Sequence, residues 1–262
     1  MSFRSVAIIG LGLLGGSTGL AVQQFLPDVA TTGWDMDPAT RARAAERGLV
    51  GTVCDDPAAA VADADLVILC VPVGAMAAAA AAIAPGLKPG VVVSDVGSSK
   101  QTVASALAAA LPGVAVIPAH PVAGTERSGP DAGFASLFQQ RWCIITPPEA
   151  ADPAQVQALS RFWEALGAKV EVMTAQHHDM VLAITSHLPH LIAYTIVGTA
   201  DDLEGVTQGE VIKYSAGGFR DFTRIAASDP TMWRDVFLSN KDAVLEMLQR
   251  FTEDLTALQR AI

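Results

Sequence analysis

The sequence predicts an α/β domain built on a mainly parallel sheet, followed by an all-helical domain. Apolar runs of strand length alternate with helical stretches along the first part of the chain, which is typical of a parallel sheet covered by helices on both faces. After about Thr174 no convincing strand pattern follows, and helical stretches continue to the end. The 262 residues suit two domains, which we expect at 1–173 and 174–262.

The expected strands are short, continuously apolar and rich in branched residues. They cover 6–10, 29–34, 66–71, 91–96, 114–118, 142–146 and 168–173. The helices expected between them cover about 14–25, 38–47, 73–84, 99–111 and 153–166. The helices expected in the second domain cover about 174–200, 203–215, 219–228 and 230–260.

Composition and charge exclude several kinds of partner. The formal net charge of −10 argues against general affinity for nucleic acid or anionic lipid. The nineteen uncharged residues from Leu66 to Ala84 approach the length of a membrane span, but Pro72 and Gly74 interrupt them. A strand, a turn and a surface helix are expected there instead. With no signal-peptide pattern at the start and three scattered cysteines, we expect a cytoplasmic protein without a membrane segment.

A glycine-rich loop, GLGLLG at 10–15, lies between the first strand and the first helix. Gly10 permits a tight turn, Gly12 lets a pyrophosphate approach the backbone, and Gly15 lets the helix pack closely on the strand. The helix N-terminus then offers N–H groups to the phosphate. This context predicts a Rossmann-type, doubly wound domain that binds a dinucleotide.

Asp35 ends the second strand, twenty residues after Gly15. A carboxylate there accepts hydrogen bonds from both ribose hydroxyls and repels a 2′-phosphate, which favours NAD over NADP. The alternative is that Asp35 only caps the helix starting at Pro38, although Asp37 is better placed for that cap. The residues that we expect to bind the cofactor are Gly10, Gly12, Leu13, Leu14, Gly15, Asp35, Val71 and Pro72.

Two later motifs follow strands whose carboxyl ends should face the ligand. DVGSSK (95–100) places Ser98 at a strand-to-helix turn, and AHPVAGTERSG (119–129) places His120 directly after an apolar strand. Both should face the nicotinamide half of the cofactor, and Pro121 restricts the backbone of His120 to extended conformations. A buried structural histidine is the alternative interpretation of His120.

The helical half carries further candidate residues. SHLPH (186–190) places His187 and His190 on one helix face, with Pro189 bending the helix. An HxxH pair suggests a metal, but no clear cysteine or glutamate accompanies it, so no metal is expected.

Arg224 lies in the motif GGFRDFTRIAASDPTMWRDVF (217–237), where Asp221 can pair with it at a spacing of three. The apolar residues that flank Arg224 indicate partial burial, and a buried arginine needs an anion. A solvated surface charge is the alternative.

Taken together, GLGLLGGS, DVGSSK, HPVAGTERSG, SHLPH and the long Arg224 motif resemble the prephenate/arogenate (cyclohexadienyl) dehydrogenase family of tyrosine biosynthesis. The resemblance covers nearly the whole chain, in order. It implies an NAD-dependent homodimer that oxidises and decarboxylates a small anionic substrate, prephenate or arogenate, to 4-hydroxyphenylpyruvate or tyrosine. It also implies a helical dimerisation domain and an active site between the two domains.

The resemblance assigns roles to the candidate residues. His120 matches the catalytic histidine that accepts the C4 hydroxyl hydrogen, and Ser98 matches the serine that assists it. Arg224 matches the arginine that binds a substrate carboxylate. The other residues that match the substrate pocket are Thr125, Glu126, His187, His190, Asp221 and Trp233.

Two alternative functions remain open from the sequence. A β-hydroxyacid or imine dehydrogenase also has a Rossmann domain followed by helices, but it uses a lysine, and neither Lys213 nor Lys241 lies in a matching motif. A non-catalytic NAD-sensing protein would not require His120, Ser98 and Arg224 together.

Overall fold

The computed structural model describes residues 3–125, 127–207 and 210–262. It divides into two compact units, the first ending at His178 and the second beginning at Asp179. This division falls inside helix α7 (Ala175–Leu182), which starts in the N-terminal unit and continues into the helical unit. The domain boundary expected at 173/174 stays a prediction.

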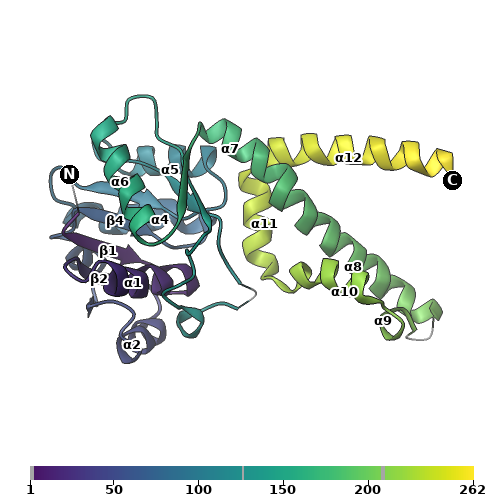
Figure 1. Cartoon of the computed structure of the whole chain (residues 1–262), viewed down its shortest axis with the longest axis horizontal. Coiled ribbons are helices and arrows are strands. Elements are labelled where there is room, and N and C mark those ends of the chain that lie inside the picture. Colours follow the sequence, from purple (N-terminus) through teal and green to yellow (C-terminus); the bar gives the residue numbers. More distant parts are fainter. Residues whose placement is uncertain (1–2, 126, 208–209) are drawn as a thin grey trace. The chain divides into compact units, whose positions relative to one another are not determined.

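The N-terminal unit is built on a six-stranded parallel sheet in the order β3-β2-β1-β4-β5-β6 (Figure 1). Its strands are β1 (Ser5–Ile9), β2 (Ala30–Trp34), β3 (Thr52–Val53), β4 (Leu66–Leu69), β5 (Val92–Asp95) and β6 (Ala115–Val116). The helices between them are α1 (Leu13–Phe25), α2 (Pro38–Glu46), α3 (Pro57–Val61), α4 (Met76–Ile83) and α5 (Gln101–Ala110). The predicted fold class, a Rossmann-type sheet followed by a helical part, is confirmed.

Both faces of this sheet are buried, which explains the continuously apolar strands. On β1, Val6 and Ile8 belong to one apolar core, whereas Ala7 and Ile9 belong to the other. The first core includes residues of α1 and the second includes residues of α4 and α5. The uncharged stretch at 66–84 is accordingly the buried strand β4, a turn and helix α4, as expected.

A second sheet of three strands carries His120, and this position differs from the one expected from the sequence. Its order is β7-β8-β9, with β7 (Ala119–Pro121) antiparallel to β8 (Trp142–Ile145) and β9 (Lys169–Val172) parallel to β8. Helix α6 (Pro153–Ala165) connects β8 to β9. His120 was expected directly after a strand at 114–118, but β6 stops at Val116. The N–H of Ile117 still donates to the Val93 carbonyl of β5, whereas the Pro118 carbonyl accepts from the N–H of Thr146, which follows β8, so the chain passes from the first sheet to the second there.

The strand β3 and the helix α3 were not expected from the sequence. They span two and five residues, respectively. Elements this short do not complete a period of apolar residues, so the pattern of the sequence does not indicate them.

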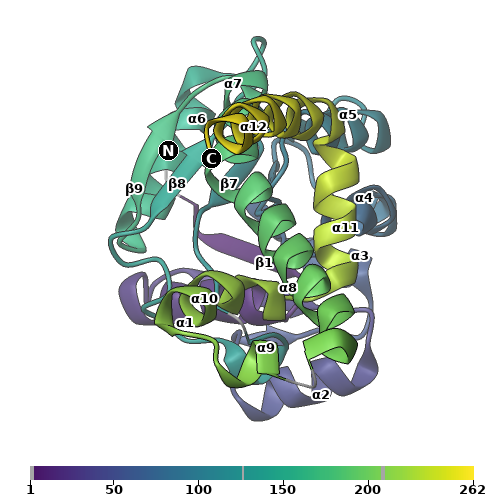
Figure 2. The same ribbon diagram turned by 90° about the vertical axis from the view of Figure 1, so that its right-hand side faces the viewer.

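The helical unit contains α8 (Leu188–Thr207), α9 (Glu210–Lys213), α10 (Gly217–Thr223), α11 (Pro230–Ser239) and α12 (Lys241–Ala261). A π-helical turn (Ala183–His187) joins α7 to α8, and a 3-10 turn (Arg224–Ala227) follows α10. Helix α10 lies alongside α8 (Figure 2). The unit's apolar core is centred on Ala183, Leu188, Val244 and Met247.

Two helices expected as continuous are interrupted. The stretch at 219–228 ends as a 3-10 turn, and the stretch at 230–260 breaks at Asn240, which separates α11 from α12. One continuous helical stretch, 175–203, is long and apolar enough to cross a membrane by length and composition alone.

Candidate active site

The glycine loop follows β1 and opens α1 as the sequence predicts. Gly10 has φ +96°, a conformation that side chains disfavour, and a Cβ there would lie 2.7 Å from the Cys70 carbonyl oxygen. A Cβ on Gly15 would lie 1.8 Å from the Gly10 carbonyl oxygen, so only glycine lets α1 approach the strand end this closely. A Cβ on Gly12 would meet no atom of the described residues within 4 Å. The backbone at Gly12 is therefore open to a ligand.

The N-terminus of α1 is left available for an anion. Gly12 is its N-cap residue, and no side chain of the described residues caps it. By contrast, α2 and α6 are capped by the carboxylates of Asp37 and Asp152. Backbone N–H groups and the positive end of the helix dipole at α1 suit a pyrophosphate.

Asp35, which is half-buried at the end of β2, braces the glycine loop. One carboxylate oxygen accepts the N–H of Leu11 at 2.8 Å, and the other accepts the N–H of Asp37 at 3.0 Å. The helix cap of α2 belongs to Asp37, which accepts from the N–H groups of Ala39 and Thr40. The alternative in which Asp35 only caps this helix is therefore wrong.

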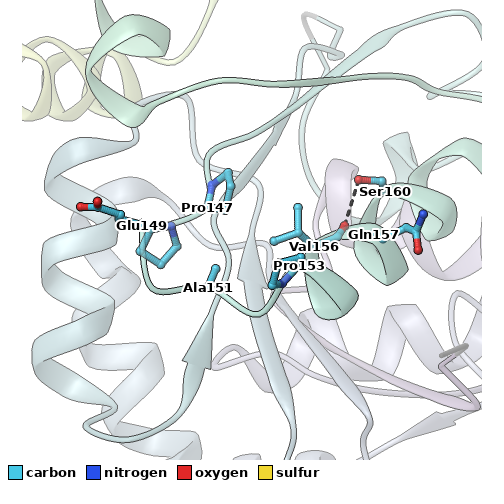
Figure 3. Close-up of a pocket in the computed structure, with 8 residues that line it drawn as sticks. Pro147, Glu149, Ala151, Pro153, Val156, Gln157 and Ser160 are labelled. Carbon is cyan, nitrogen blue, oxygen red and sulfur yellow. Dashed lines mark hydrogen bonds between the residues drawn. The ribbon is translucent and has the colours of Figure 1, made fainter.

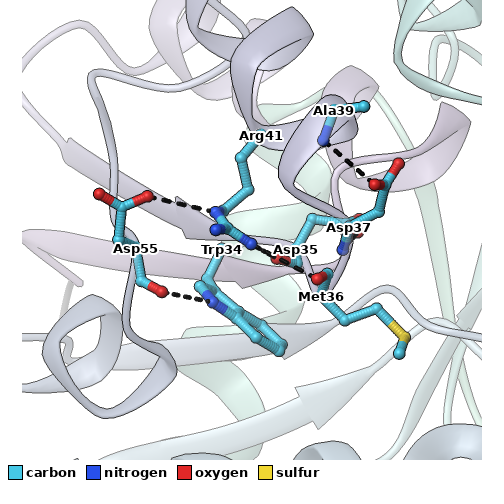
Figure 4. A network of polar contacts seen from close by, with 7 residues as sticks. All are labelled: Trp34, Asp35, Met36, Asp37, Ala39, Arg41 and Asp55. Carbon is cyan, nitrogen blue, oxygen red and sulfur yellow. Dashed lines mark hydrogen bonds and ion pairs between the residues drawn. The ribbon is translucent and has the colours of Figure 1, made fainter.

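Arg41 is the cation closest in sequence to this carboxylate, and Figure 4 shows it turned toward protein acceptors. Its guanidinium donates to the Asp35 carbonyl at 2.8 Å and contacts the Asp55 carboxylate at 3.4 Å. Among the described residues, the Arg41 guanidinium therefore binds these acceptors and not the Asp35 carboxylate. The residues at this edge thus fit NAD, with Val71 packed against Gly10.

The two later motifs meet through a buried ion pair. Lys100 and Asp95, both within DVGSSK, pair with each other and are fully buried. Lys100 also donates to the Ala119 carbonyl at 2.7 Å, and the second Asp95 oxygen accepts the Ala119 N–H at 3.3 Å. Ala119, the residue before His120, is therefore bound to the motif that carries Ser98. The sequence analysis expected the two motifs to face the same half of the cofactor.

His120 is buried, at 8 % exposure, and contacts a second buried histidine. Its Nδ1 lies 2.8 Å from Nε2 of His178, and the two rings meet edge to face. His178 stands in the first turns of α7, where its backbone N–H donates to the Thr174 carbonyl. His178 was not expected in the site from the sequence. The adjacent histidines at 177 and 178, in a chain with only five histidines, are a sequence signal that could have indicated it.

The loop that follows His120 returns to the nucleotide-binding edge. The N–H of Phe134 donates to the Ser17 hydroxyl at 3.1 Å, and Arg47, which follows α2, donates to the Gly133 carbonyl at 3.2 Å. Ser98 is half-buried, and Thr125 is exposed at the start of this loop. Glu126, expected in the substrate pocket, lies outside the described residues.

In the helical unit, the two histidines of SHLPH have different surroundings. His187 is fully buried, and its Nδ1 accepts from the side-chain amide of Asn240 at 3.1 Å, so its proton is on Nε2. The same amide also donates to the Asp179 carbonyl at 2.7 Å. Asn240 was not expected, because a lone asparagine in a helical stretch gives no sequence signal.

His190 is half-buried and stacks on Trp233, with ring centroids 3.6 Å apart. Its Nδ1 donates to the Ser186 carbonyl at 2.9 Å, and burial lowers its pKa below the ordinary value. The π-helical turn just before Pro189 accommodates the missing proline N–H. The Nε1 of Trp233 is buried without a hydrogen-bond partner among the described residues.

The expectation that Arg224 is partly buried is wrong. Arg224 is exposed where α10 gives way to the 3-10 turn, and its neighbour Phe222 is itself 38 % exposed. The described residues include no ion pair between Arg224 and Asp221, which is also exposed. No carboxylate of the described residues forms an ion pair with the Arg224 guanidinium.

A surface pocket lies elsewhere in the N-terminal unit. It has a volume of about 500 Å³ and is formed by the loop between β8 and α6 and the start of α6 (Figure 3). Its lining includes Glu149 and four prolines or alanines near it but no basic residue. An anionic substrate would meet no cation in this pocket.

Comparison with known proteins places these features in one family. Residues 18–172 match the model of the prephenate dehydrogenase nucleotide-binding domain, and residues 174–262 match that of the prephenate dehydrogenase dimerization domain. The chain is 48 % identical to the cyclohexadienyl dehydrogenase of Zymomonas mobilis, over 99 % of this chain and 89 % of the relative. It is 32 % identical to the prephenate dehydrogenase of Bacillus subtilis, over 97 % of this chain and 69 % of the relative.

A solved structure supports the same assignment. The chain is similar to the crystal structure of prephenate dehydrogenase from A. aeolicus in complex with hydroxyphenyl propionate and NAD+, with a TM-score of 0.92 and 32 % identity, over 99 % of this chain and 91 % of that one. The predicted NAD-dependent prephenate/arogenate dehydrogenase activity and the predicted cofactor are confirmed, and the two alternative functions are not supported. The chain belongs to the prephenate dehydrogenase family.

Proposed function

We propose that His120 is the general base in the NAD-dependent oxidation of prephenate or arogenate. The observation that carries this proposal is the buried His120 whose Nδ1 is engaged by His178 at 2.8 Å. That contact directs the other ring nitrogen, Nε2, to act on the substrate. Neutral imidazole suits this task because its ordinary pKa of about 6.5 lies near physiological pH.

The proton and electron movements are balanced by this assignment. NAD+, when bound, supplies the oxidising power by accepting a hydride from ring C4. His120 accepts the proton of the C4 hydroxyl as the C4–O bond gains carbonyl character. The bond from C1 to its carboxylate then breaks, CO₂ leaves, and the electron pair makes the ring aromatic. His120 can return its proton to the phenolate oxygen, so the histidine ends the cycle neutral.

The remaining site residues bind and orient the substrate in this proposal. Arg224 binds a substrate carboxylate through two parallel hydrogen bonds, which suits an exposed guanidinium. Ser98 assists His120 near the nicotinamide. The other residues that we propose to contact the substrate are Thr125, Glu126, His187, His190, Asp221 and Trp233.

Cofactor contacts follow the geometry of the glycine loop. The N-terminus of α1 and the open backbone at Gly12 would hold the pyrophosphate, and Asp35 would accept from the ribose hydroxyls. The other residues proposed to contact the cofactor are Gly10, Leu13, Leu14, Gly15, Val71 and Pro72.

A direct assay tests the function. The purified protein is mixed with NAD+ and either prephenate or arogenate, and NADH formation is followed by absorbance. We expect turnover with at least one of the two substrates, and the ratio of their kcat/KM values gives the preference. Absence of NADH with both substrates would contradict the proposed function.

We also propose a cytoplasmic homodimer formed through the helical unit. Leu255 and Leu258 of α12 are 53 % and 59 % exposed, and Val197 of α8 is 40 % exposed. Apolar exposure of this kind is typical of a surface that pairs with another chain. Light scattering after size-exclusion chromatography should give twice the mass of one chain, and Leu255→Glu with Leu258→Glu should shift the mass toward that of one chain.

A further inference from the structure

We propose that His178 is a positioning residue that fixes the tautomer and orientation of His120. This inference rests on the proposed role of His120 as the base and extends it to a residue outside the motifs. The 2.8 Å separation of His120 Nδ1 and His178 Nε2 is a hydrogen-bond distance, so one nitrogen carries the shared proton and the other accepts it.

The chemistry decides which nitrogen carries that proton. A neutral His120 that removes a proton with Nε2 must hold its own proton on Nδ1. Nδ1 then donates to His178 Nε2, and His178 must carry its proton on Nδ1. The wrong tautomer of His120 would present an N–H to the substrate hydroxyl, where no proton could be accepted.

The same contact stabilises the product of proton transfer. When His120 gains the substrate proton it becomes a cation, and its Nδ1–H becomes a stronger donor. His178 Nε2 accepts this charge-assisted hydrogen bond in a buried site, since the two histidines are 8 % and 0 % exposed. In this proposal the neutral imidazole of His178 orients the catalytic histidine and stabilises its cation. A carboxylate has this function in a serine–histidine–aspartate triad.

The framework around the two rings is rigid enough to hold this geometry. His120 sits in β7, where it pairs with Ile144 of β8, and the ion pair of Lys100 and Asp95 binds the residue before it. His178 sits on α7, whose first turn is held by Thr174, the residue before the helix. The Thr174 carbonyl and hydroxyl accept from the backbone N–H groups of His178 and His177, respectively. Strands β7, β8 and β9 connect the two supports.

Three variants separate an orienting role from a packing role. His178→Leu fills much of the space but provides no acceptor. His178→Gln places an amide oxygen near the position of Nε2 and keeps an acceptor. The matched control is His177→Leu, which removes the neighbouring, exposed histidine from the same helix turn.

Steady-state kinetics with NAD+ and prephenate, or arogenate where that is the better substrate, provide the first readout. We expect His178→Leu to lower kcat on the order of 10- to 100-fold, less than the roughly 10²- to 10⁴-fold that the base itself contributes, with little change in either KM. His178→Gln should recover most of the loss, and His177→Leu should match wild type. A His178→Leu variant with wild-type kcat would overturn the proposal.

The second readout is the ¹⁵N NMR spectrum of His120 in histidine-labelled protein, which does not depend on turnover. In wild type at neutral pH, we expect a protonated Nδ1 and an unprotonated Nε2, and in His178→Leu a loss of this single tautomer. A wild-type His120 protonated on Nε2 would overturn the inference even if the enzyme is active. An inactive wild type with the expected tautomer would instead count against the proposed function alone. If His178→Leu does not fold, His178→Gln and the wild-type spectrum decide.

Discussion

Lys100 and Asp95 form an ion pair in which neither side chain is exposed to solvent. Lys100 also donates to the Ala119 carbonyl, and Asp95 also accepts from the Ala119 N–H. The pair thereby joins the end of β5 to β7 and holds the residue that precedes His120. Fold stability and the position of the proposed base depend on the same two charges.

Removal of Lys100 should therefore be costly. Lys100→Met leaves the Asp95 carboxylate buried without its cation, so we expect the free energy of unfolding to fall by about 3–5 kcal/mol. Urea denaturation followed by circular dichroism measures this change.

Lys88→Met is the matched control for that variant. Lys88 pairs with Asp65 at 2.7 Å, but both side chains are about one-third exposed, at 36 % and 33 %. Solvent screens this pair, so its loss should cost about 1 kcal/mol or less. Equal losses in the two lysine variants would show that burial of the Lys100 pair is not what matters.

Asp35 should determine affinity for NAD. Asp35→Ser removes the carboxylate that would accept from the ribose hydroxyls, so we expect KM for NAD+ to rise about 10- to 100-fold. Discrimination against NADP+ should fall at the same time, because the repulsion of a 2′-phosphate is lost. Initial rates over a range of each cofactor give both values.

The control for Asp35 lies two residues away. Asp37→Ser keeps a side chain that can cap α2, and Asp37 has no proposed contact with the cofactor. Its KM for NAD+ should stay near that of wild type. If Asp35→Ser also keeps the wild-type KM, then Asp35 only braces Leu11 and the loop.

Arg224→Gln should weaken substrate binding. The variant loses a bidentate, charge-assisted contact with a carboxylate, so we expect KM for the substrate to rise about 10- to 100-fold with a smaller change in kcat. Arg220→Gln, at another exposed arginine of the same segment, is the control and should bind substrate normally. An unchanged KM for the substrate in Arg224→Gln would show that Arg224 does not bind the substrate carboxylate.

The burial of His190 should appear as a pH dependence of stability. Burial lowers the pKa of His190, whereas the unfolded chain retains the ordinary value of about 6.5. As pH falls below about 6.5, the unfolded state takes up the proton first, so the folded state loses stability. The contribution is fully present above that pH and is lost toward the lower folded pKa.

His190→Gln removes this titration and leaves the other histidines in place. Thermal unfolding at pH 7.5 and pH 5.5 should therefore show a larger drop in Tm for wild type than for the variant. The same drop in both proteins would mean that His190 does not titrate differently in the folded state.

The sequence predicts the architecture well because long, periodic features determine it. The buried parallel strands, the glycine loop and the change to helices after Thr174 are all patterns that extend over many residues. The short elements β3 and α3 escape prediction because they do not complete a period.

The site is predicted less fully because its supports depend on tertiary contacts. His178 and Asn240 act through partners 58 and 53 residues away in the chain, and no local spacing relates them to those partners. The burial of Arg224 was misjudged because apolar neighbours in sequence do not cover a side chain at the end of a short helix.

The role of His120 is tested most directly by His120→Asn assayed at saturating NAD+ and substrate. Asparagine keeps a polar side chain of similar reach but cannot accept the hydroxyl proton as a base. We predict that kcat for NADH formation falls about 10²- to 10⁴-fold while KM changes little. A variant that turns over at nearly the wild-type rate would contradict the account.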